Sequence, residues 1–290
     1  MAIRLRGEKI SERSLEFNVM SEMINSIRSI VRNAYIVGYT ARQEAYHGLD
    51  VSIGAPGNLV LGGYQFKAPS RKRANNYYFR IGDRCWICSN PRQEIIEALR
   101  KHGLSESCVN QHSILYMTSM ILEQKLGTPV YYALPLIHTY SELEQRILNI
   151  LDYTILIRVL DIPLKTVLDC TRHNIEITLP PTGPNNAIVN IYSEPIKIPK
   201  GKIKTLHETI NEQLKKLNNL PKNPGPKHFD VEEVKAIVKQ EVKRKIREEE
   251  LSPELAEKAR KLFNILAEEI SFSYRGRAIV IKPSQQSQQK

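Results

Sequence analysis

A carboxylate, an amide and an amine lie within or beside two neighbouring β-like segments. Asp50 lies near the start of the first segment, Leu49 to Ile53, and Gln65 and Lys67 lie at the end of the second, which begins at Leu59. Side chains two residues apart on a strand point to the same side of a sheet. Pairing of these two strands would bring Asp50 beside the other two side chains. The spacing therefore predicts that the three converge on one face of a mixed sheet.

These residue types suit the hydrolysis of a phosphodiester assisted by a metal ion. That reaction needs a divalent cation, which stabilises negative charge on the phosphate and lowers the pKa of a bound water. Mg²⁺ prefers oxygen ligands and keeps several waters. The candidate ligands are the carboxylates of Asp50 and Glu44, the amide oxygen of Gln65 and the backbone carbonyl of Phe66. Lys67 is placed to orient the attacking water or to stabilise the pentavalent phosphorus.

The pattern Gly48-x-Asp50, followed after a spacer by Gln65-x-Lys67, resembles the core of the PD-(D/E)xK nucleases. It is closest to the Mrr-type restriction endonucleases, in which glutamine commonly replaces the second acid. The downstream segment with Gln111 and Tyr116 is similar to the glutamine-and-tyrosine helix of RecB-like members. The resemblance covers roughly residues 15 to 138, under half of the chain.

The resemblance implies a restriction-endonuclease-like core, an α/β fold in which helices flank a mixed β-sheet. It implies a Mg²⁺ or Mn²⁺ cofactor and an accessory role for Gln111 and Tyr116. The catalytic residues that it implies are Glu44, Asp50, Gln65 and Lys67, the first three of which bind the metal.

Other interpretations of the same residues stay open. Glu16 and Glu22, on the expected first helix, compete with Glu44 for the role of the helical acid, and Glu44 is preferred because it lies closer to Asp50 in sequence. Loss of the second carboxylate at Gln65 weakens a site for a hard cation and is compatible with an inactive descendant. In the purely structural interpretation, Asp50 is a capping residue and Glu44 faces solvent. Gln65 and Lys67 then lie on an exposed face of the sheet.

A basic turn with neighbouring aromatic residues follows Lys67 directly. Arg71, Lys72 and Arg73 can neutralise phosphates, and Tyr77 can stack on an unpaired base. The formal net charge of +11 also favours a polyanionic partner. We therefore expect this turn to bind nucleic acid, although a solvated β-turn would show the same composition.

The remaining patterns give the order of the elements. We expect a helix or helix pair over 14–46, strands at 49–53, 59–66, 77–81, 129–135 and 187–192, and helices over 91–101, 109–126, 141–150 and 231–250, with another helix starting at Ser252-Pro253. The expected organisation is a nuclease-like α/β domain over 1–204, a helix and Pro-rich linker over 205–228, and a helical C-terminal region over 229–290. Residues 272–281 are expected to form a hairpin or a returning strand.

The four cysteines are too few for a disulfide scaffold, so we expect them to be free or metal-bound. Cys85 and Cys88 have the spacing of half a zinc site, which Cys108 and His112 could complete. We disfavour zinc because the last two lie one turn apart at a helix start and no second close cysteine pair exists. The basic charge of the helix over 235–247 is offset by interleaved glutamates.

No apolar run is long enough to span a bilayer, and the first residues lack the apolar stretch of a secretory signal. We expect a cytoplasmic protein with no membrane partner, and a homodimer stays open. The leading function is a metal-dependent endonuclease acting on DNA in restriction, defence or repair. The alternatives are an inactive nucleic-acid-binding protein on a nuclease fold and a structural or assembly protein.

Overall fold

A mixed β-sheet of six strands forms the centre of the protein in the computed structural model. The structure describes residues 8–40, 44, 48–55, 59–82, 93–169, 173–192, 195–197, 203–217 and 231–276. The strands of the first sheet, in spatial order, are β1 (Tyr35–Gly38), β2 (Val51–Ala55), β3 (Leu59–Phe66), β6 (Val130–Pro135), β7 (Thr154–Arg158) and β11 (Ile203–Thr205). Only β3 and β6 run parallel, so the prediction of a mixed sheet is confirmed.

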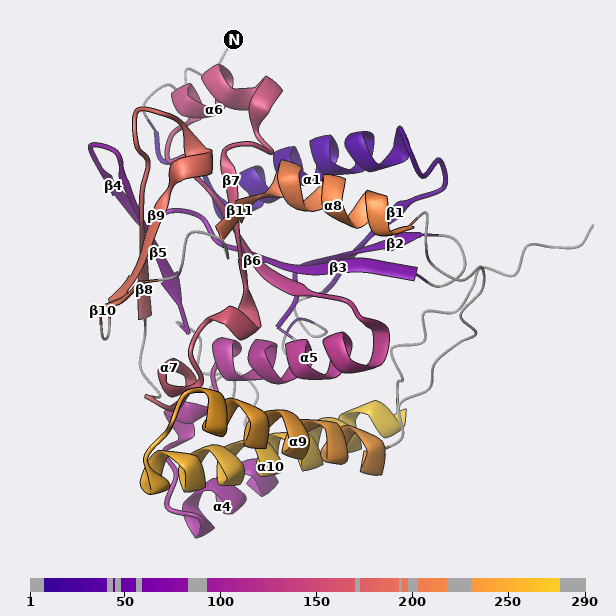
Figure 1. The fold of residues 1–290 in the computed structure, drawn as a ribbon, viewed down its shortest axis with the longest axis vertical. Helices are drawn as coiled ribbons and strands as arrows, with labels where there is room; N and C mark the ends of the chain where they lie inside the picture. The colour runs from indigo at the N-terminus through magenta and orange to yellow at the C-terminus, as the bar shows by residue number, and fades with distance from the viewer. Residues whose placement is uncertain are drawn as a thin grey trace, which may run out of the picture.

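The alternation of side chains along β3 sorts the two faces of this sheet. Tyr64 and Phe66 are fully buried against the helices α1 (Glu12–Arg28) and α8 (Leu206–Leu217). Gln65 lies between them in sequence and therefore faces the opposite side. That side is covered by the helix α5 (Gln111–Leu126), as Figure 1 shows. The polar residue of the motif is thus directed at α5.

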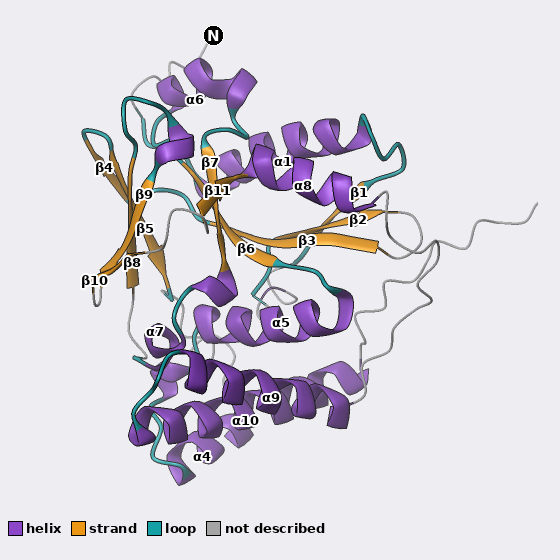
Figure 2. Ribbon diagram, in the orientation of Figure 1, coloured by secondary structure: helices purple, strands orange, loops and turns teal. Residues whose placement is uncertain are grey.

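A second sheet, entirely antiparallel, stands beside the first (Figure 2). Its strands, in spatial order, are β10 (Pro195–Lys197), β9 (Ile188–Tyr192), β8 (His173–Thr178), β5 (Asn76–Ile81) and β4 (Arg71–Arg73). The side chains of Phe79, Ile177 and Ile191 point inward and share one hydrophobic cluster with α5. The segment 77–81, expected as a strand, lies in this sheet and pairs with β8, about a hundred residues downstream.

The remaining helices lie around the two sheets (Figure 1). They include α4 (Gln93–Lys101), α6 (Tyr140–Arg146), α7 (Leu164–Leu168), α9 (Val231–Glu248) and α10 (Pro253–Gly276), and 3₁₀ turns lie at Glu106–Cys108, Ile147–Asn149, Val159–Asp161 and Pro184–Asn186. The helices α9 and α10 pack side by side beyond α5 (Figure 1). Val238 and Phe263 join the same hydrophobic cluster as α5. The C-terminal helices therefore extend the core on the side of α5.

Several sequence predictions are confirmed and others are wrong. The expected strands at 49–53 and 59–66 and the helix over 109–126 lie within two residues of β2, β3 and α5. The helix or helix pair expected over 14–46 is confirmed for α1 and wrong for residues 35–38, which form the edge strand β1, whereas Glu44 is again helical. The hairpin over 272–281 is wrong as far as Gly276, where α10 ends. The rest of that segment and the Pro-rich linker lie outside the described residues.

Cys108 is fully buried and disulfide-bonded. The expectation that the cysteines are free or metal-bound is therefore wrong for this residue. Cys85, Cys88 and Cys170 lie outside the described residues. In the described part of the chain, no helix is both long and apolar enough to cross a membrane.

Gly48 brings the chain close to α5 just before Asp50. Its φ of 73° lies in the left-handed region, and a Cβ there would stand 2.9 Å from the Cβ and 3.1 Å from the Cα of Leu115. Gly103 has a similar φ of 69° but open space around it.

We expect Gly48→Ala to destabilise the protein more than Gly103→Ala does. Strain in the left-handed region should cost each variant about 1 to 2 kcal/mol, and overpacking against Leu115 should cost Gly48→Ala about 1 to 3 kcal/mol more. Urea unfolding of the two variants measures the difference. Equal losses would show that the chain does not need this close approach.

Candidate functional site

Asp50 is held against the end of β3 by two hydrogen bonds to a single carboxylate oxygen. Its Oδ2 accepts from the Gln65 amide at 2.8 Å and from the Phe66 backbone N–H at 2.7 Å. Its Oδ1 makes no hydrogen bond with any described residue. The strands β2 and β3 are neighbours, as expected, and pair antiparallel, and the backbone N–H of Asp50 donates to the Tyr64 carbonyl at 3.0 Å.

Gln111, the first residue of α5, connects the remaining side chains. Its Nε2 donates to Glu44 Oε1 at 2.7 Å and to Gln65 Oε1 at 3.2 Å. Its Oε1 accepts from the Lys67 Nζ at 3.0 Å. The predicted convergence of Asp50, Gln65 and Lys67 is therefore confirmed as geometry, with Glu44 linked to the same network.

The local sequence fixes the position of Gln111. The side chain of Asn110 caps α5 by accepting from the backbone N–H of Ser113 at 3.0 Å. In return, the Ser113 hydroxyl accepts from the backbone N–H of Asn110. This capping box defines where the helix starts. Gln111 is nearly fully buried at that end, so its amide has few alternative partners.

Burial raises the pKa of Asp50 to about 7. Loss of solvation is the largest cause, and the nearby carboxylates of Glu44 and Glu12 add to it. The ammonium group of Lys67 and the Phe66 N–H oppose it. The site thus places the desolvated carboxylate of Asp50 near the ammonium group of Lys67.

On α1, burial also raises the pKa of Glu16, although Arg13 pairs with it at 3.1 Å.

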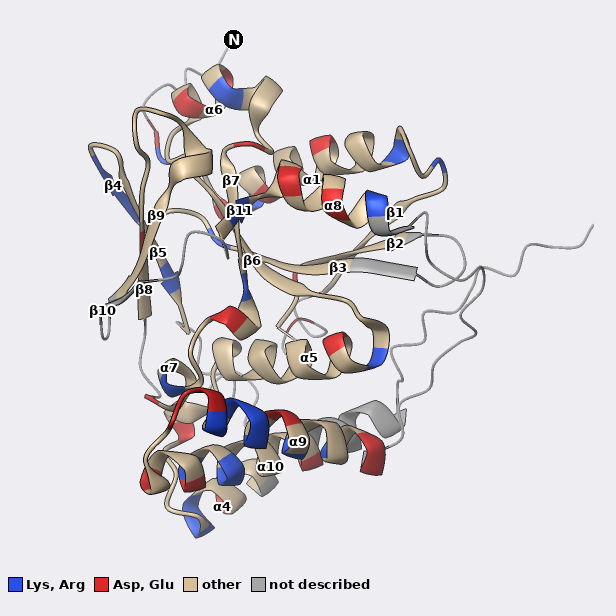
Figure 3. Ribbon diagram, viewed as in Figure 1, with Lys and Arg blue, Asp and Glu red and all other residues tan. Residues whose placement is uncertain are grey.

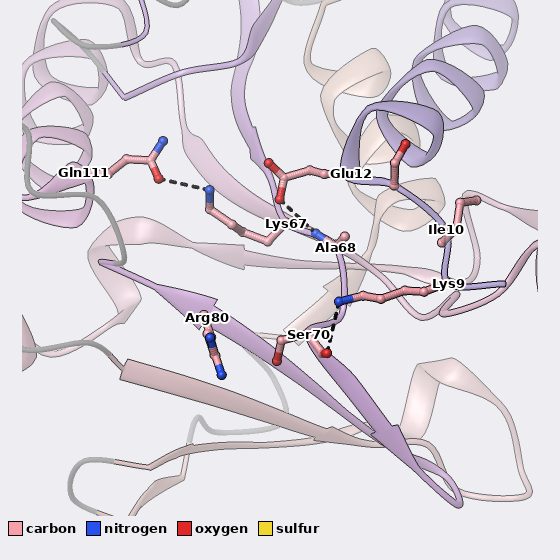
Figure 4. Close-up of a pocket in the computed structure, with 9 residues that line it drawn as sticks. Lys9, Ile10, Glu12, Lys67, Ala68, Ser70, Arg80 and Gln111 are labelled. Carbon is pink, nitrogen blue, oxygen red and sulfur yellow. Dashed lines mark hydrogen bonds between the residues drawn. The ribbon is translucent and has the colours of Figure 1, made fainter. Parts of the chain in front are cut away.

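A pocket of about 500 Å³ opens beside Lys67. Its lining comes from four parts of the chain: the start of α1, the segment after β3, the strand β5 and the first residue of α5. Figure 4 shows Lys67 extended toward Gln111, with Glu12 near the backbone of Ala68. The pocket leads from solvent to the network around Asp50.

The oxygen atoms at this site are of the type that a hard cation takes as ligands. Gln65 Nε2 donates to Asp50 Oδ2 and, at 3.4 Å, to the Phe66 carbonyl, so an N–H donor bridges two oxygens that a cation would also attract. A turned amide would present its oxygen at the same place. Asp50, Glu44, Gln65 and the Phe66 carbonyl would hold the ion. Among the described residues, however, no group of three or more His, Cys, Asp or Glu side chains is arranged to bind a metal.

The structure divides the basic turn between two faces of the second sheet. Tyr77 is fully buried, and its hydroxyl bonds to Glu142 and Arg146, so its ring is not available to stack on a base. Lys72 lies on the same face and forms a salt bridge with Glu142. The sequence interpretation is therefore wrong for Tyr77 and is weakened for Lys72. Arg71 and Arg73 are exposed on the other face.

Two other candidates lie in the core. Tyr116 is fully buried beside Phe263, with ring centroids 5.9 Å apart, so it is no part of the site around Gln111. His112 is also buried, and its Nδ1 bonds to the Tyr132 hydroxyl at 2.9 Å. Loss of solvation lowers the pKa of His112 to about 3, and His173 adds to this effect. Cys108 is disulfide-bonded and offers no thiolate for the zinc set.

Sequence reasoning missed the three charged residues that line the pocket besides Lys67. Lys9 lines it and donates to the Ser70 carbonyl at 3.1 Å. Glu12 lines it and accepts from the Ala68 N–H at 3.2 Å. Arg80 lines it from β5. The only signal for Glu12 was its place in the first turn of a helix, and nothing local marked the other two.

Comparisons with known proteins add no relatives to this description. The chain matches no protein-family model, no curated protein and no solved structure.

We expect Asp50→Asn to stabilise the metal-free protein as the pH rises. The folded-state pKa of Asp50 lies above its ordinary value of 3.8, so the folded state binds the proton more tightly than the unfolded state does. The wild-type protein therefore loses stability as the pH rises from 4 to 7. Asparagine keeps an oxygen acceptor for Gln65 and Phe66 and has no charge to desolvate. The free energy of unfolding of the variant, relative to wild type, should rise by on the order of 3 kcal/mol from pH 4 to pH 8.

Urea unfolding in EDTA at the two pH values measures this difference. A difference that does not change with pH would show that the carboxylate is not desolvated.

Proposed function

We propose that this protein is a metal-dependent nuclease that hydrolyses phosphodiester bonds in DNA. The observation that supports it best is the single hydrogen-bonded network joining Asp50, Gln65 and Lys67 to Glu44 through Gln111. These are the residue types that such hydrolysis requires, and they lie at the end of a pocket. The resemblance to PD-(D/E)xK nucleases, read from the same residues, is part of this proposal.

The residues of the chain have distinct tasks in the proposed reaction. The Asp50 and Glu44 carboxylates would hold a Mg²⁺ or Mn²⁺ ion, together with oxygens from Gln65 and Phe66. A bound ion of this kind lowers the pKa of water and offsets charge on the phosphate. Lys67 presents its ammonium group to the phosphate or to the attacking water, because its Nζ lies in the network at the pocket wall. Gln111 positions Lys67 and Glu44.

The charges that line the pocket favour an anionic substrate such as a phosphodiester. Lys9, Lys67 and Arg80 contribute three positive side chains to its lining, against the one carboxylate of Glu12. A phosphodiester brings one negative charge per unit and offers several oxygen acceptors. The overall charge of +11 would attract such a polymer from a distance.

An inactive nucleic-acid-binding protein is the second candidate. Two observations favour it: glutamine stands at position 65 where an acid would strengthen the site, and the described residues hold no cluster of three metal-ligating carboxylates or their equivalents. Both candidates share the pocket and its positive charge, so only cleavage separates them.

We expect Asp50→Asn and Lys67→Met to lower the rate of Mg²⁺- or Mn²⁺-dependent cleavage of labelled DNA by about 100-fold or more. The first variant replaces a negatively charged cation ligand with a neutral amide, and the second removes the positive charge beside the phosphate. Glu22→Gln is the matched control, because Glu22 lies on α1 outside the pocket. Circular dichroism checks that each variant is folded.

Cleavage assays on single-stranded, duplex and branched DNA give the measurement. A wild-type protein that cleaves none of them with either cation would sink the nuclease proposal and favour the inactive binder. A loss of activity in Glu22→Gln equal to that in Asp50→Asn would show that the wrong acid is assigned.

We expect Gln65→Glu to bind Mg²⁺ several-fold more tightly than wild type at pH 8. The variant places a third carboxylate next to Asp50 and Glu44, and a hard cation gains affinity from an added negative oxygen ligand. Isothermal titration calorimetry without DNA measures the change. An unchanged affinity would count against Gln65 as a ligand and against this placement of the ion.

A further inference from the structure

Three exposed arginines lie on the outer face of the second sheet. Arg71 and Arg73 project from β4 and Arg80 from β5, and the alternation of both strands puts them on the face opposite the buried Tyr77 and Phe79. None of the three forms an ion pair with a described residue. Figure 3 shows β4 and a stretch of β5 in blue beside the first sheet. Among the described residues, this face therefore carries more positive than negative side chains.

Arg80 connects this face to the candidate site. It lines the same pocket as Lys67 and Gln111, and Figure 4 shows it on β5 beneath them. The chain between the two sheets is also tied down, because Lys9 bonds to the Ser70 carbonyl and Ser70 Oγ bonds to Tyr78 O at 2.9 Å. Arg80 thus belongs both to the arginine face and to the pocket wall.

The chemistry of the face suits phosphates better than bases. Arg71 lies over the ring of Tyr78 at 4.3 Å, so one side of that ring is already covered. Asn174, Thr178 and Asn190 add uncharged polar groups on the neighbouring strands. The acid of this face, Glu176, is buried and accepts from Asn76 Nδ2 at 2.8 Å. Guanidinium groups are well matched to phosphate oxygens.

The spacing of the arginines fits a nucleic-acid strand that lies along the sheet over a length of several nucleotides. Arg73 pairs with Asn76, and Arg80 lies four residues farther along β5. Four residues of strand span about 14 Å. One strand of a duplex advances about 3.4 Å per nucleotide along the helix axis, so this distance corresponds to roughly four nucleotides.

We infer that the outer face of the second sheet is a phosphate track, which binds the sugar–phosphate backbone of the nucleic-acid strand that enters the pocket. Arg80 binds the backbone next to the reacting phosphodiester, and Arg71 and Arg73 bind it farther out. The inference rests on the proposed function for the identity of the ligand. It adds a binding surface outside the metal site and independent of sequence, since its contacts are to phosphate.

The test measures DNA binding without cleavage. The triple variant Arg71→Ala, Arg73→Ala, Arg80→Ala is compared with wild type by fluorescence anisotropy in EDTA, with labelled duplex and single-stranded DNA, over a range of salt concentrations. The control variant is Lys239→Ala, Lys243→Ala, Arg247→Ala, which removes three exposed positive charges from α9 on the far side of α5. Circular dichroism verifies folding of both.

The track predicts that the triple variant binds duplex about 10- to 100-fold more weakly near 0.1 M salt, and that the slope of log K against log salt becomes shallower by about two to three. The control should keep the wild-type slope to within about one. Equal effects of the two variants would mean that only net charge matters and would overturn the track, as would wild-type protein that binds neither DNA form.

A preference for single strands over duplex would identify the form that the track accepts. Because no cation is present, the two proposals fail separately. Wild-type protein that binds through the arginines but never cleaves would overturn the nuclease and leave the track. Protein that cleaves, with the triple variant binding as tightly as wild type, would overturn the track and leave the nuclease.

Discussion

One buried amide, that of Gln111, holds the candidate site together. It donates to Glu44 and Gln65 and accepts from Lys67, so both of its polar atoms are used. A carboxylate in its place would repel Glu44, and an ammonium group would repel Lys67. Only a side chain that both donates and accepts can bridge an acid and a lysine in this way. The position of α5 relative to β3 therefore determines whether the site exists.

The hydrophobic cores on the two faces of the first sheet hold α5 in its position relative to β3. On one face, Tyr64 and Phe66 anchor β3 against α1 and α8. On the other, α5 is packed between the sheet and the pair α9 and α10. Close-packed interiors shift little, so α5 has no room to move away from β3. The C-terminal helices thus support the site from a distance without contributing a side chain to it.

The sequence was informative where local patterns decide structure. The two-residue period put Gln65 and Lys67 on one face, and β-like composition between turn residues marked β2 and β3 as strands. It failed where distant pairing decides. The strand β5 pairs with β8, which lies about a hundred residues away, and that partner settles that Tyr77 faces the core while Tyr78 and Arg80 face outward. The edge strand β1 has only four residues, too few to interrupt a helical pattern visibly.

The single parallel pair, β3 with β6, has a consequence for the order of folding. Antiparallel β2 and β3 need only a short connection, whereas β3 and β6 must be joined by a long crossover that contains β4, β5, α4 and α5. Closing such a loop costs chain entropy before any distant contact offsets it. Gln111 lies inside the crossover, 67 residues from Glu44. A chain that has formed only the hairpin of β2 and β3 already holds Asp50 beside Gln65. It still lacks the pocket and the hydrogen bond from Lys67 to Gln111. Both form only when the crossover closes.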